Sequence, residues 1–438
     1  MSKVFENSSS ARNPYLIFSP FLIFFIGYVI YFMTDGVSGD QPRYLMYANN
    51  LLHGFYSPPE LDLRNGPGYP IVLIPFVALH MPFISMTILN AVLHYLSIVF
   101  LFKALLLIVS HRKAFFISLF WACYYIGYQY MSAISYEPIS IFLMALLVLC
   151  LTRAFMLTDP KKMKRYVYLS GFVLGYLALT KVIFGYVIFI MLIACGLFWL
   201  RNRNVVNYRK GALITLIACI VTIPYLVYTA NLTGRIFYWG TGQENLYWMT
   251  TPYPDEYGDW KGELTKNPVD LGNYNVADAG DTLKAHHQLD YDSVYKYQGL
   301  ERDDAFKKIA VHNIKTDPIK YGKNIVYNIG RIFFHYPFSY ATQRTKILLV
   351  FPLNGIVLTL ILGCLLPTFK NWRKIAYPVR FALIIALLYL AENALLSSEV
   401  RVLTLVMPII LFWGAYIIQR SVKVSLKFFD NSGKNFHD

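Results

Sequence analysis

Long apolar runs, separated by short polar or basic stretches, dominate this sequence. A helix that crosses about 30 Å of hydrocarbon needs roughly 20 predominantly apolar residues. Ten runs approach that length, at 15–33, 84–109, 114–133, 138–157, 166–181, 184–200, 210–229, 347–366, 378–397 and 402–419. The pattern therefore predicts an all-α polytopic membrane protein with about ten transmembrane helices. No small-residue cleavage site follows the first run, so we interpret it as an uncleaved anchor.

Basic residues in the short loops predict the orientation of these helices. Short loops rich in lysine and arginine stay in the cytoplasm during insertion. Such residues recur in alternate loops, at 111–113, 161–165, 201–210 and 370–374, and again in the carboxy-terminal tail. We therefore expect both termini in the cytoplasm and the other loops on the outer side, with a composition that fits a bacterial inner membrane.

The positive charge of the chain is unevenly distributed. The chain is 56% hydrophobic and only 15% charged, yet carries a net charge of +15. Segment 230–346 holds 14 basic and 14 acidic residues, so the excess lies in the expected cytoplasmic loops and tails, facing anionic lipid headgroups. No nucleic-acid partner is expected. All five cysteines fall in apolar runs, where they act as small hydrophobic residues.

The first outer segment, 34–83, is longer than a connector needs to be. Apolar residues follow a helical period from Tyr44 to Leu52, and Gly54 follows as a stop. This spacing predicts an amphipathic helix on the outer membrane surface. A second short apolar stretch, 71–79, is expected at the same interface.

The second outer segment, 230–346, predicts a small lobe of mixed α/β character. Its beginning is rich in glycine, tyrosine and tryptophan, and its later part, 303–334, has helical spacing. The predicted organisation is a transmembrane module with the first outer loop (1–229), an extracytoplasmic lobe (230–346), and carboxy-terminal helices with a cytoplasmic tail (347–438).

Charged residues at the expected outer side come from several separate stretches. They are Asp35, Asp40, Arg43, Glu60, Asp62, Arg64, Glu137, Lys181, Glu392, Glu399 and Arg401. Charged groups at membrane depth are costly and tend to mark functional sites. We therefore predict one site beneath the outer lobe.

Short motifs occur in a fixed order along these stretches. They are Gly39-Asp40-Gln41-Pro42-Arg43-Tyr44, Arg64-Asn65-Gly66-Pro67-Gly68-Tyr69-Pro70, Ser135-Tyr136-Glu137-Pro138, Leu179-Thr180-Lys181, Pro224-Tyr225 with Asn231, Gly234 and Arg235, Gly242-Gln243-Glu244-Asn245-Leu246-Tyr247, and Arg401 with Pro408. Together they resemble the GT-C membrane glycosyltransferases, in the branch of the protein O-mannosyltransferases and the lipid A aminoarabinose transferase. Gln41 departs from the second acidic residue that members often carry, and the lobe resembles the family mainly at its two ends.

The resemblance implies an inverting glycosyltransferase with a GT-C-like fold. Such enzymes move a sugar from a polyprenyl-phosphate-linked donor to an acceptor, here a glycan, lipid or protein on the outer face of the membrane. Asp40 is the expected general base, and Arg64, Lys181 and Arg401 are expected to bind the donor phosphate. Substrate binding is expected of Arg43, Tyr44, Tyr69, Glu137, Arg235 and Glu244. No cofactor is implied.

Structural roles remain open for the same residues. Asp40 could cap the amphipathic helix, Arg64 could bind lipid headgroups, and Lys181 and Arg401 could be snorkelling anchors. Glu137, at a helix start, suits the helix dipole.

One alternative function remains open, together with two weaker signals: a pair of histidines and a group of aromatic residues. A transporter or flippase of lipid-linked glycans is the alternative function, although no internal repeat is visible. His286 and His287, with Asp290 and Asp292, have the residue types of a metal site but not a clear ligand spacing, so a divalent metal there stays open only as the minor alternative. Some of the aromatic residues Tyr238, Trp239, Tyr247 and Trp248 could stack on a sugar.

Overall fold

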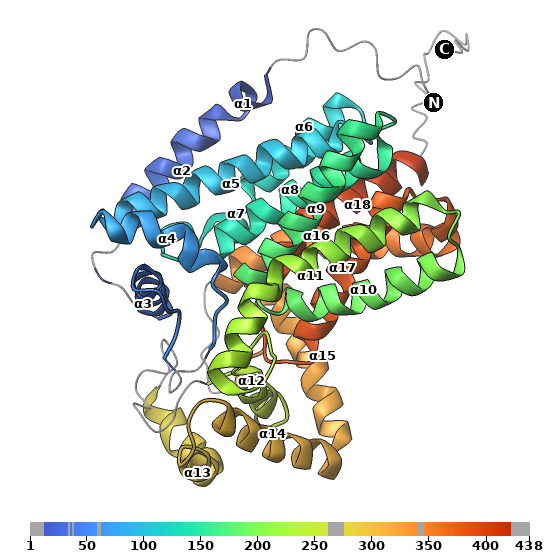
Figure 1. The fold of residues 1–438 in the computed structure, drawn as a ribbon. Helices are drawn as coiled ribbons and strands as arrows, with labels where there is room; N and C mark the ends of the chain where they lie inside the picture. Colours follow the sequence, from blue (N-terminus) through green and yellow to red (C-terminus); the bar gives the residue numbers. More distant parts are fainter. Residues whose placement is uncertain are drawn as a thin grey trace, which may run out of the picture.

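Helices form a bundle that carries a smaller helical lobe at one end (Figure 1). The computed structural model describes residues 13–33, 36, 39–58, 63–261, 276–339 and 346–421. Within these ranges the regular structure is helical and includes no strand. A helix satisfies its backbone polar groups within one segment, which is what a bilayer demands.

The first half of the bundle precedes the lobe. Its helices are α1 (Pro14–Ile17), α2 (Ser19–Phe32), α3 (Gln41–Leu52), α4 (Gly68–Ala78), α5 (Phe83–Leu105), α6 (His111–Cys123), α7 (Tyr125–Tyr128), α8 (Glu137–Met156), α9 (Pro160–Thr180), α10 (Phe184–Arg201) and α11 (Val206–Thr233). After the lobe come α16 (Lys346–Lys370), a 3-10 turn (Trp372–Lys374), α17 (Tyr377–Ala394) and α18 (Arg401–Ser421).

Seven of the described helices are long and apolar enough to cross a membrane, judged by length and composition. They are α5, α8, α10, α11, α16, α17 and α18. The other three expected spans differ: α2 has 14 residues, α6 has 13, and α9 has 21 but begins with a basic cluster. The chain is thus a polytopic membrane protein by composition, and the number of about ten spans stays a prediction.

Helix α18 occupies the centre of the bundle. Its most apolar window is 89% buried, against 22% for α16 at the periphery. It packs on α8 and α17, and α8 in turn packs on α5 and α9. The last helix of the chain therefore contacts helices from the first half, which brings its amino-terminal end close to theirs.

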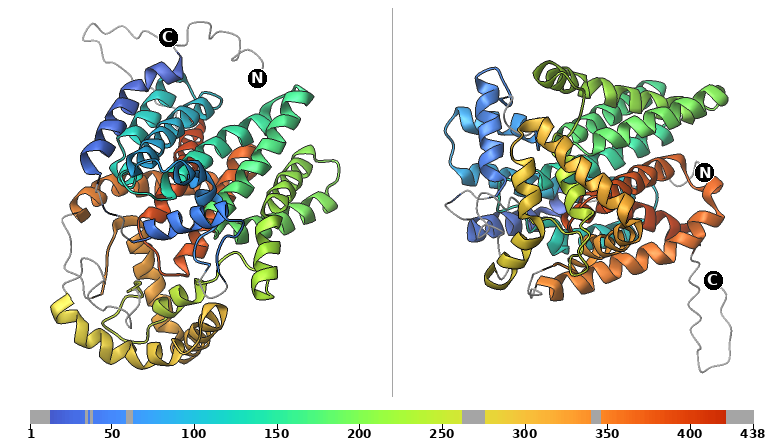
Figure 2. Two further views of the ribbon diagram at one scale, coloured as in Figure 1. Left: turned by 60° about the vertical axis from the view of Figure 1, so that its left-hand side comes forward. Right: turned by 90° about the horizontal axis from the view of Figure 1, so that it is seen from below.

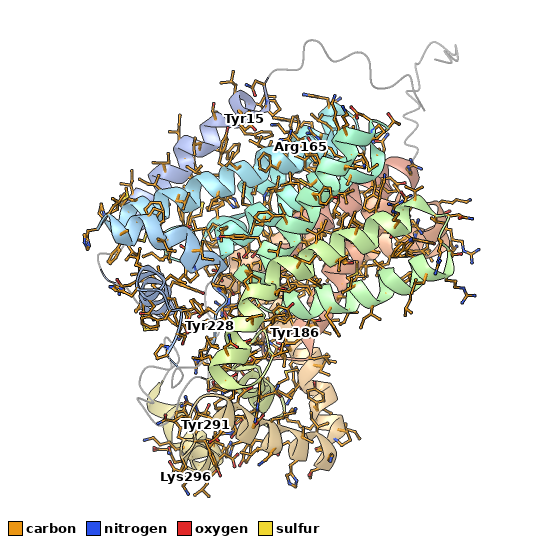
Figure 3. All side chains as sticks on the ribbon, in the orientation of Figure 1. Tyr15, Arg165, Tyr186, Tyr228, Tyr291 and Lys296 are labelled. Carbon is orange, nitrogen blue, oxygen red and sulfur yellow. The ribbon has the colours of Figure 1, made fainter. Side chains whose placement is uncertain are left out.

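The basic loops and the lobe lie at opposite ends of the bundle. Figure 3 places Arg165, in the basic first turns of α9, at the end away from the lobe, and Tyr291 and Lys296 in the lobe itself. This arrangement agrees with the orientation predicted from charge. Which end faces the cytoplasm stays a prediction.

Helices α3 and α4 form in the first outer segment where helices were predicted. Helix α3 directly follows Asp40 and carries Pro42 in its first turn, where the missing N–H costs nothing. Its buried residues include Tyr44, Tyr47 and Ala48, on the apolar face that the sequence indicated. Their position at the membrane surface stays a prediction.

The mixed α/β character predicted for the lobe is wrong for its described residues, which form α12 (Gly242–Met249), α13 (Val276–Val294), α14 (Gly299–Thr316) and α15 (Pro318–Phe334). Figure 2 shows these helices covering one end of the bundle. The aromatic residues that suggested strands instead form an aromatic core: Tyr247 and Trp248 of α12 pack against Tyr291 and Phe306.

Asp303 of α14 ties that helix to α12. Its Oδ1 accepts a hydrogen bond of 2.9 Å from the Gln243 backbone N–H. Withdrawal of the carboxyl from water raises the pKa of Asp303 to about 7. In the unfolded chain this carboxyl ionises near its ordinary pKa of about 3.9, so stability falls as pH rises from about 4 to 7.

Asp303→Asn is expected to remove this pH dependence, because the amide cannot ionise and still accepts the Gln243 N–H. Thermal unfolding of the purified chain should show the variant gaining stability relative to wild type between pH 4.5 and 7.5. Asp292→Asn, at an exposed site on α13, is the matched control. An equal pH response in Asp303→Asn and wild type would contradict the argument.

Candidate active site

A polar pocket lies where the lobe meets the bundle. Residues from separate elements line it, among them Asp40, Arg64, Lys181 and Arg401. Arg43 and Glu244 line it too. So do several of the residues 393–402, which run from the end of α17 to the start of α18. The structure therefore brings together the four residues that the sequence singled out as catalytic or phosphate-binding.

Asp40 lies at the start of α3 without capping it. Its side chain makes no capping hydrogen bond and instead accepts one from Arg43 Nη1 at 3.0 Å. Arg43 Nη1 also donates to Asn65 Oδ1 at 3.2 Å. The Asp40 side chain is 42% exposed, so its carboxylate is oriented by Arg43 and remains accessible from the pocket. The capping role left open by the sequence is not what the geometry shows.

Two glycines allow the loop that contains Arg64 to lie in close contact with the end of α9. A Cβ on Gly66 would lie 2.1 Å from the Leu179 carbonyl oxygen, and one on Gly68 would lie 2.5 Å from Thr180 Oγ1. The Tyr176 hydroxyl donates to the Gly68 carbonyl at 2.8 Å. Arg64 and Lys181 thus reach the same pocket because these glycines permit backbone contact.

Gly66→Ala is expected to displace the loop, since the added methyl meets backbone that cannot move aside. Overpacking of this kind costs about 1–3 kcal/mol, so the unfolding temperature should fall and the pocket's activity should fall with it. Gly196→Ala is the matched control, because a Cβ there meets nothing within 4 Å. Wild-type stability and activity in Gly66→Ala would show that the close approach is dispensable.

Arg64 joins the bundle to the lobe. Its Nη2 lies 3.2 Å from Glu244 Oε2, and both side chains are largely buried. Glu244, on α12, also accepts a hydrogen bond of 3.2 Å from the Tyr291 hydroxyl of α13. The pair fixes the lobe against the pocket and places a guanidinium on its wall.

Lys181 follows the last residue of α9. Its Nζ donates to the Tyr136 hydroxyl at 2.7 Å. Burial, with the Glu137 carboxylate nearby, raises the pKa of Tyr136 well above its ordinary value, so this hydroxyl stays neutral. Among the described residues Lys181 forms no ion pair, and its charge is the least compensated of the three candidate cations.

Arg401 and Glu137 begin two neighbouring helices. Arg401 is the first residue of α18 and Glu137 the first of α8, and Arg401 Nη1 lies 3.5 Å from Glu137 Oε1. The Glu137 side chain is 3% exposed and that of Arg401 39%. A helix amino terminus carries partial positive charge, so Arg401 and the start of α18 together favour an anion at this wall of the pocket.

Asn328 of α15 holds the turn that leads to Arg401. Its Nδ2 donates to the carbonyls of Asn393 at 2.9 Å and Ala394 at 3.0 Å, and its Oδ1 accepts from the Ser398 N–H at 3.0 Å. These contacts satisfy backbone groups at the end of α17 that the helix leaves unpaired. The lobe therefore positions the turn before α18.

Four predicted substrate-binding residues do not line the pocket: Tyr44, Tyr69, Arg235 and Glu137, which is buried against Arg401. Tyr44 and Tyr69 are buried, with ring centroids 5.2 Å apart. Tyr44 supports a residue of the pocket lining, because its Oη accepts from Asn65 Nδ2 at 3.1 Å. Arg235 lies on the surface, 2.6 Å from Asp304 Oδ2. It lines a separate depression, since Gly234 ends α11 and turns the chain away.

The pocket also includes residues that the sequence did not assign. Among them are Asn65, Tyr136, Thr241, Asp259 and Trp260. Neighbouring motif residues pointed to Asn65 and Tyr136, whereas Asp259 and Trp260 had no local signal. Of the four aromatic candidates for sugar stacking, Trp239 lines the pocket. Asp35, Glu60 and Asp62 lie outside the described residues.

Solved structures of other proteins share this fold. The chain is similar to the oligosaccharyltransferase of Archaeoglobus fulgidus tethered to an acceptor peptide, with 12% identity and a TM-score of 0.50 over 92% of this chain and 49% of that one. The apo form of the same protein gives 12% identity and a TM-score of 0.50, covering 92% and 50%. The chain thus spans about half the length of these neighbours.

ArnT from Cupriavidus metallidurans, bound to undecaprenyl phosphate, is a more distant match. Its identity is 12% and its TM-score 0.41, over 92% of this chain and 76% of that one. No protein-family model matches the chain, and no curated protein matches it. The comparisons therefore establish the fold, and the residues of the pocket must carry the argument about function.

Proposed function

We propose that this protein is an inverting glycosyltransferase that moves a sugar from a polyprenyl-phosphate-linked donor to an acceptor hydroxyl. The observation that carries the proposal is the pocket, which gathers Asp40, Arg64, Lys181 and Arg401 from four separate stretches. An accessible carboxylate beside several cations suits a reaction that removes a proton from one substrate and releases a phosphate from the other.

The reaction is a single displacement at the anomeric carbon. The acceptor oxygen forms a bond to that carbon while the bond from the carbon to the donor phosphate oxygen breaks. Asp40 takes the acceptor proton, and polyprenyl phosphate leaves with the electron pair. Attack from the face opposite the phosphate inverts the anomeric configuration.

Lys181 is the first ligand of the donor phosphate in this proposal. Its partner in the structure is a neutral hydroxyl, so a phosphate adds the missing negative charge. Arg64 and Arg401 each have a carboxylate partner already. They extend the positive wall and hold it in place, with the start of α18 directed at the leaving group.

Arg43, Glu137 and Glu244 act through these residues. Arg43 orients Asp40, Glu137 orients Arg401, and Glu244 orients Arg64. Trp239 and Trp260 line the pocket and offer faces for a sugar ring. The reaction as written requires no metal or cofactor in the pocket.

The pocket faces the outer side of the membrane in this proposal, with both termini in the cytoplasm and the inner membrane of a bacterium as the setting. Supporting this orientation, the basic start of α9 at Arg165 and the lobe occupy opposite ends of the bundle (Figure 3). An isoprenoid tail remains in the bilayer while its phosphate enters the pocket from the side. The acceptor is a glycan, a lipid or a protein.

Proteoliposomes that contain the purified chain test the proposal. They are supplied with polyprenyl-phosphate sugars labelled in the sugar, and with glycan, lipid and peptide acceptors. The expected result is a labelled acceptor together with free polyprenyl phosphate. Movement of the intact donor across the bilayer without any covalent change would instead support a flippase.

A further inference from the structure

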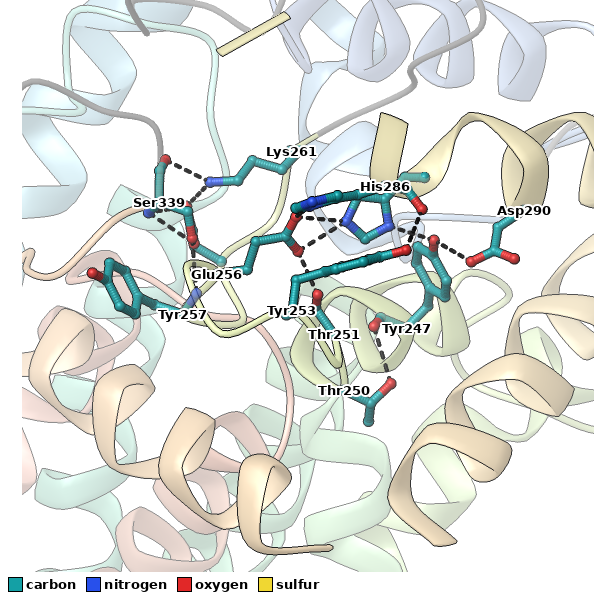
Figure 4. Close-up of polar contacts among 12 residues, drawn as sticks. Tyr247, Thr250, Thr251, Tyr253, Glu256, Tyr257, Lys261, His286, Asp290 and Ser339 are labelled. Atoms are coloured by element: carbon teal, nitrogen blue, oxygen red, sulfur yellow. Dashed lines mark hydrogen bonds and ion pairs between the residues drawn. The ribbon is translucent and has the colours of Figure 1, made fainter. Parts of the chain in front are cut away.

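Glu256, His286 and His287 meet in the lobe, apart from the pocket. One carboxylate oxygen of Glu256 lies 2.9 Å from His286 Nδ1, and both of its oxygens lie within 2.9 Å of His287 Nε2. Potential ligand atoms of all three residues lie within 4.8 Å of one another. Glu256 and His287 are almost fully buried, and the side chain of His286 is 21% exposed. Figure 4 shows the cluster between the loop after α12 and helix α13.

The partners of His287 place a proton on its Nδ1. The Tyr247 hydroxyl donates to Asp290 Oδ2 at 2.8 Å, so its oxygen accepts from His287 Nδ1–H, 2.6 Å away. In the neutral imidazole this leaves a lone pair on Nε2, directed at the Glu256 carboxylate, whereas in the imidazolium Nε2 donates to that carboxylate.

We propose that Glu256, His286 and His287 bind a divalent transition-metal ion of the zinc class. Two imidazoles and a carboxylate are a known donor set for zinc and leave one position for water. The ion would accept lone pairs from both rings and from the carboxylate, in place of the hydrogen bonds that these groups share. Zinc–ligand distances of about 2.0–2.2 Å would move the carboxylate and ring atoms apart by about half an ångström.

The surroundings have the features of an outer coordination shell. Tyr247 and Asp290 fix the tautomer of His287, as hydrogen-bond partners of metal-bound histidines do. Tyr253 stacks on the His286 ring with centroids 3.6 Å apart, and its hydroxyl donates to the His286 carbonyl at 2.8 Å. Both rings are therefore held in a binding orientation.

The ion would fasten the loop after α12 to α13. That loop continues to Asp259 and Trp260, which line the pocket. Asp259 is itself anchored, because Ser339 Oγ donates to its Oδ1 at 2.6 Å. Metal binding in the lobe would thus fix one wall of the pocket, while the metal ligands themselves stay outside it.

Cobalt(II) titration of the full chain tests the site. The protein is purified in detergent without a histidine tag and stripped with a chelator. Wild type is expected to bind one Co²⁺ per chain with visible ligand-field absorption, to exchange it for Zn²⁺, and to gain thermal stability from either ion. A wild-type chain that shows no saturable absorption would overturn the proposal, whatever the variants do.

Glu256→Gln separates a metal site from a closed hydrogen-bond network. The amide can donate to His287 Nε2 and accept from His286, so a network would survive, whereas a neutral amide is a poor ligand. We expect Co²⁺ affinity to fall about tenfold or more in Glu256→Gln and in His286→Ala. His312→Ala, at an exposed site on α14, should bind as wild type does. Wild-type affinity in Glu256→Gln and His286→Ala would contradict the assignment.

Discussion

Asp40→Asn is expected to lower the rate of sugar transfer by about 10²–10⁴-fold, the usual contribution of a positioned base. The amide matches the carboxylate in size but cannot accept the proton of the acceptor hydroxyl. Because Asp40 is 42% exposed and makes no capping bond, its replacement should leave folding intact. Donor binding should persist, since Lys181, Arg64 and Arg401 are unchanged.

The control is Asp304→Asn, which also removes a carboxylate from an ion pair with an arginine, Arg235. That pair is solvent-exposed and contributes little to stability, so transfer should continue at the wild-type rate. Measurement of kcat and of the donor dissociation constant separates the two effects. Wild-type kcat in Asp40→Asn would remove this residue as the base.

Arg401→Gln is expected to lower both stability and transfer. It leaves the Glu137 carboxylate, 3% exposed, without its partner in the bundle. Removal of one member of a buried pair costs 3–5 kcal/mol, and we expect about 2 kcal/mol here because Arg401 is partly exposed. Transfer should fall about 10²-fold or more, as on removal of a group that stabilises developing charge.

The double variant Glu137→Gln/Arg401→Gln distinguishes the two effects. Removal of both charges should restore most of the stability, measured by thermal unfolding, because no buried charge is left alone. Transfer should stay low, because the phosphate still lacks its cation. Recovery of transfer together with stability would mean that Arg401 serves only to balance Glu137.

The sequence predicted the elements that depend on local pattern. Apolar run length identified the bundle helices, and the period from Tyr44 to Leu52 located α3, because both follow from helix geometry. Asp40, Arg64, Lys181 and Arg401 were chosen as one group from their topology and motifs, and they line one pocket. Their chemical roles remain proposals.

Features that depend on distant contacts could not be read from the sequence. Asp259 and Trp260 reach the pocket through the fold of the lobe, without a local motif. Glu256 lies about 30 residues from His286 and His287, so the neighbouring Asp290 looked like the third member of the cluster. In the structure Asp290 bonds to Tyr247 instead.

The errors have a similar physical origin. The aromatic start of the lobe suggested strands, but Tyr247 and Trp248 form one side of a helix that packs on other aromatic rings. Arg235 belongs to a motif in the sequence, but the left-handed turn at Gly234 directs it to the surface. Residue type was informative in both cases, but the direction in which each side chain points was set by tertiary packing.

The most direct test of the account is the position of the donor phosphate. Electron cryomicroscopy of the chain with an excess of undecaprenyl phosphate should show the phosphate within hydrogen-bonding distance of Lys181, beside Arg401 and Arg64 and open to Asp40. A phosphate bound at the opposite end of the bundle, near Arg165, with this pocket free of lipid, would contradict the proposed active site.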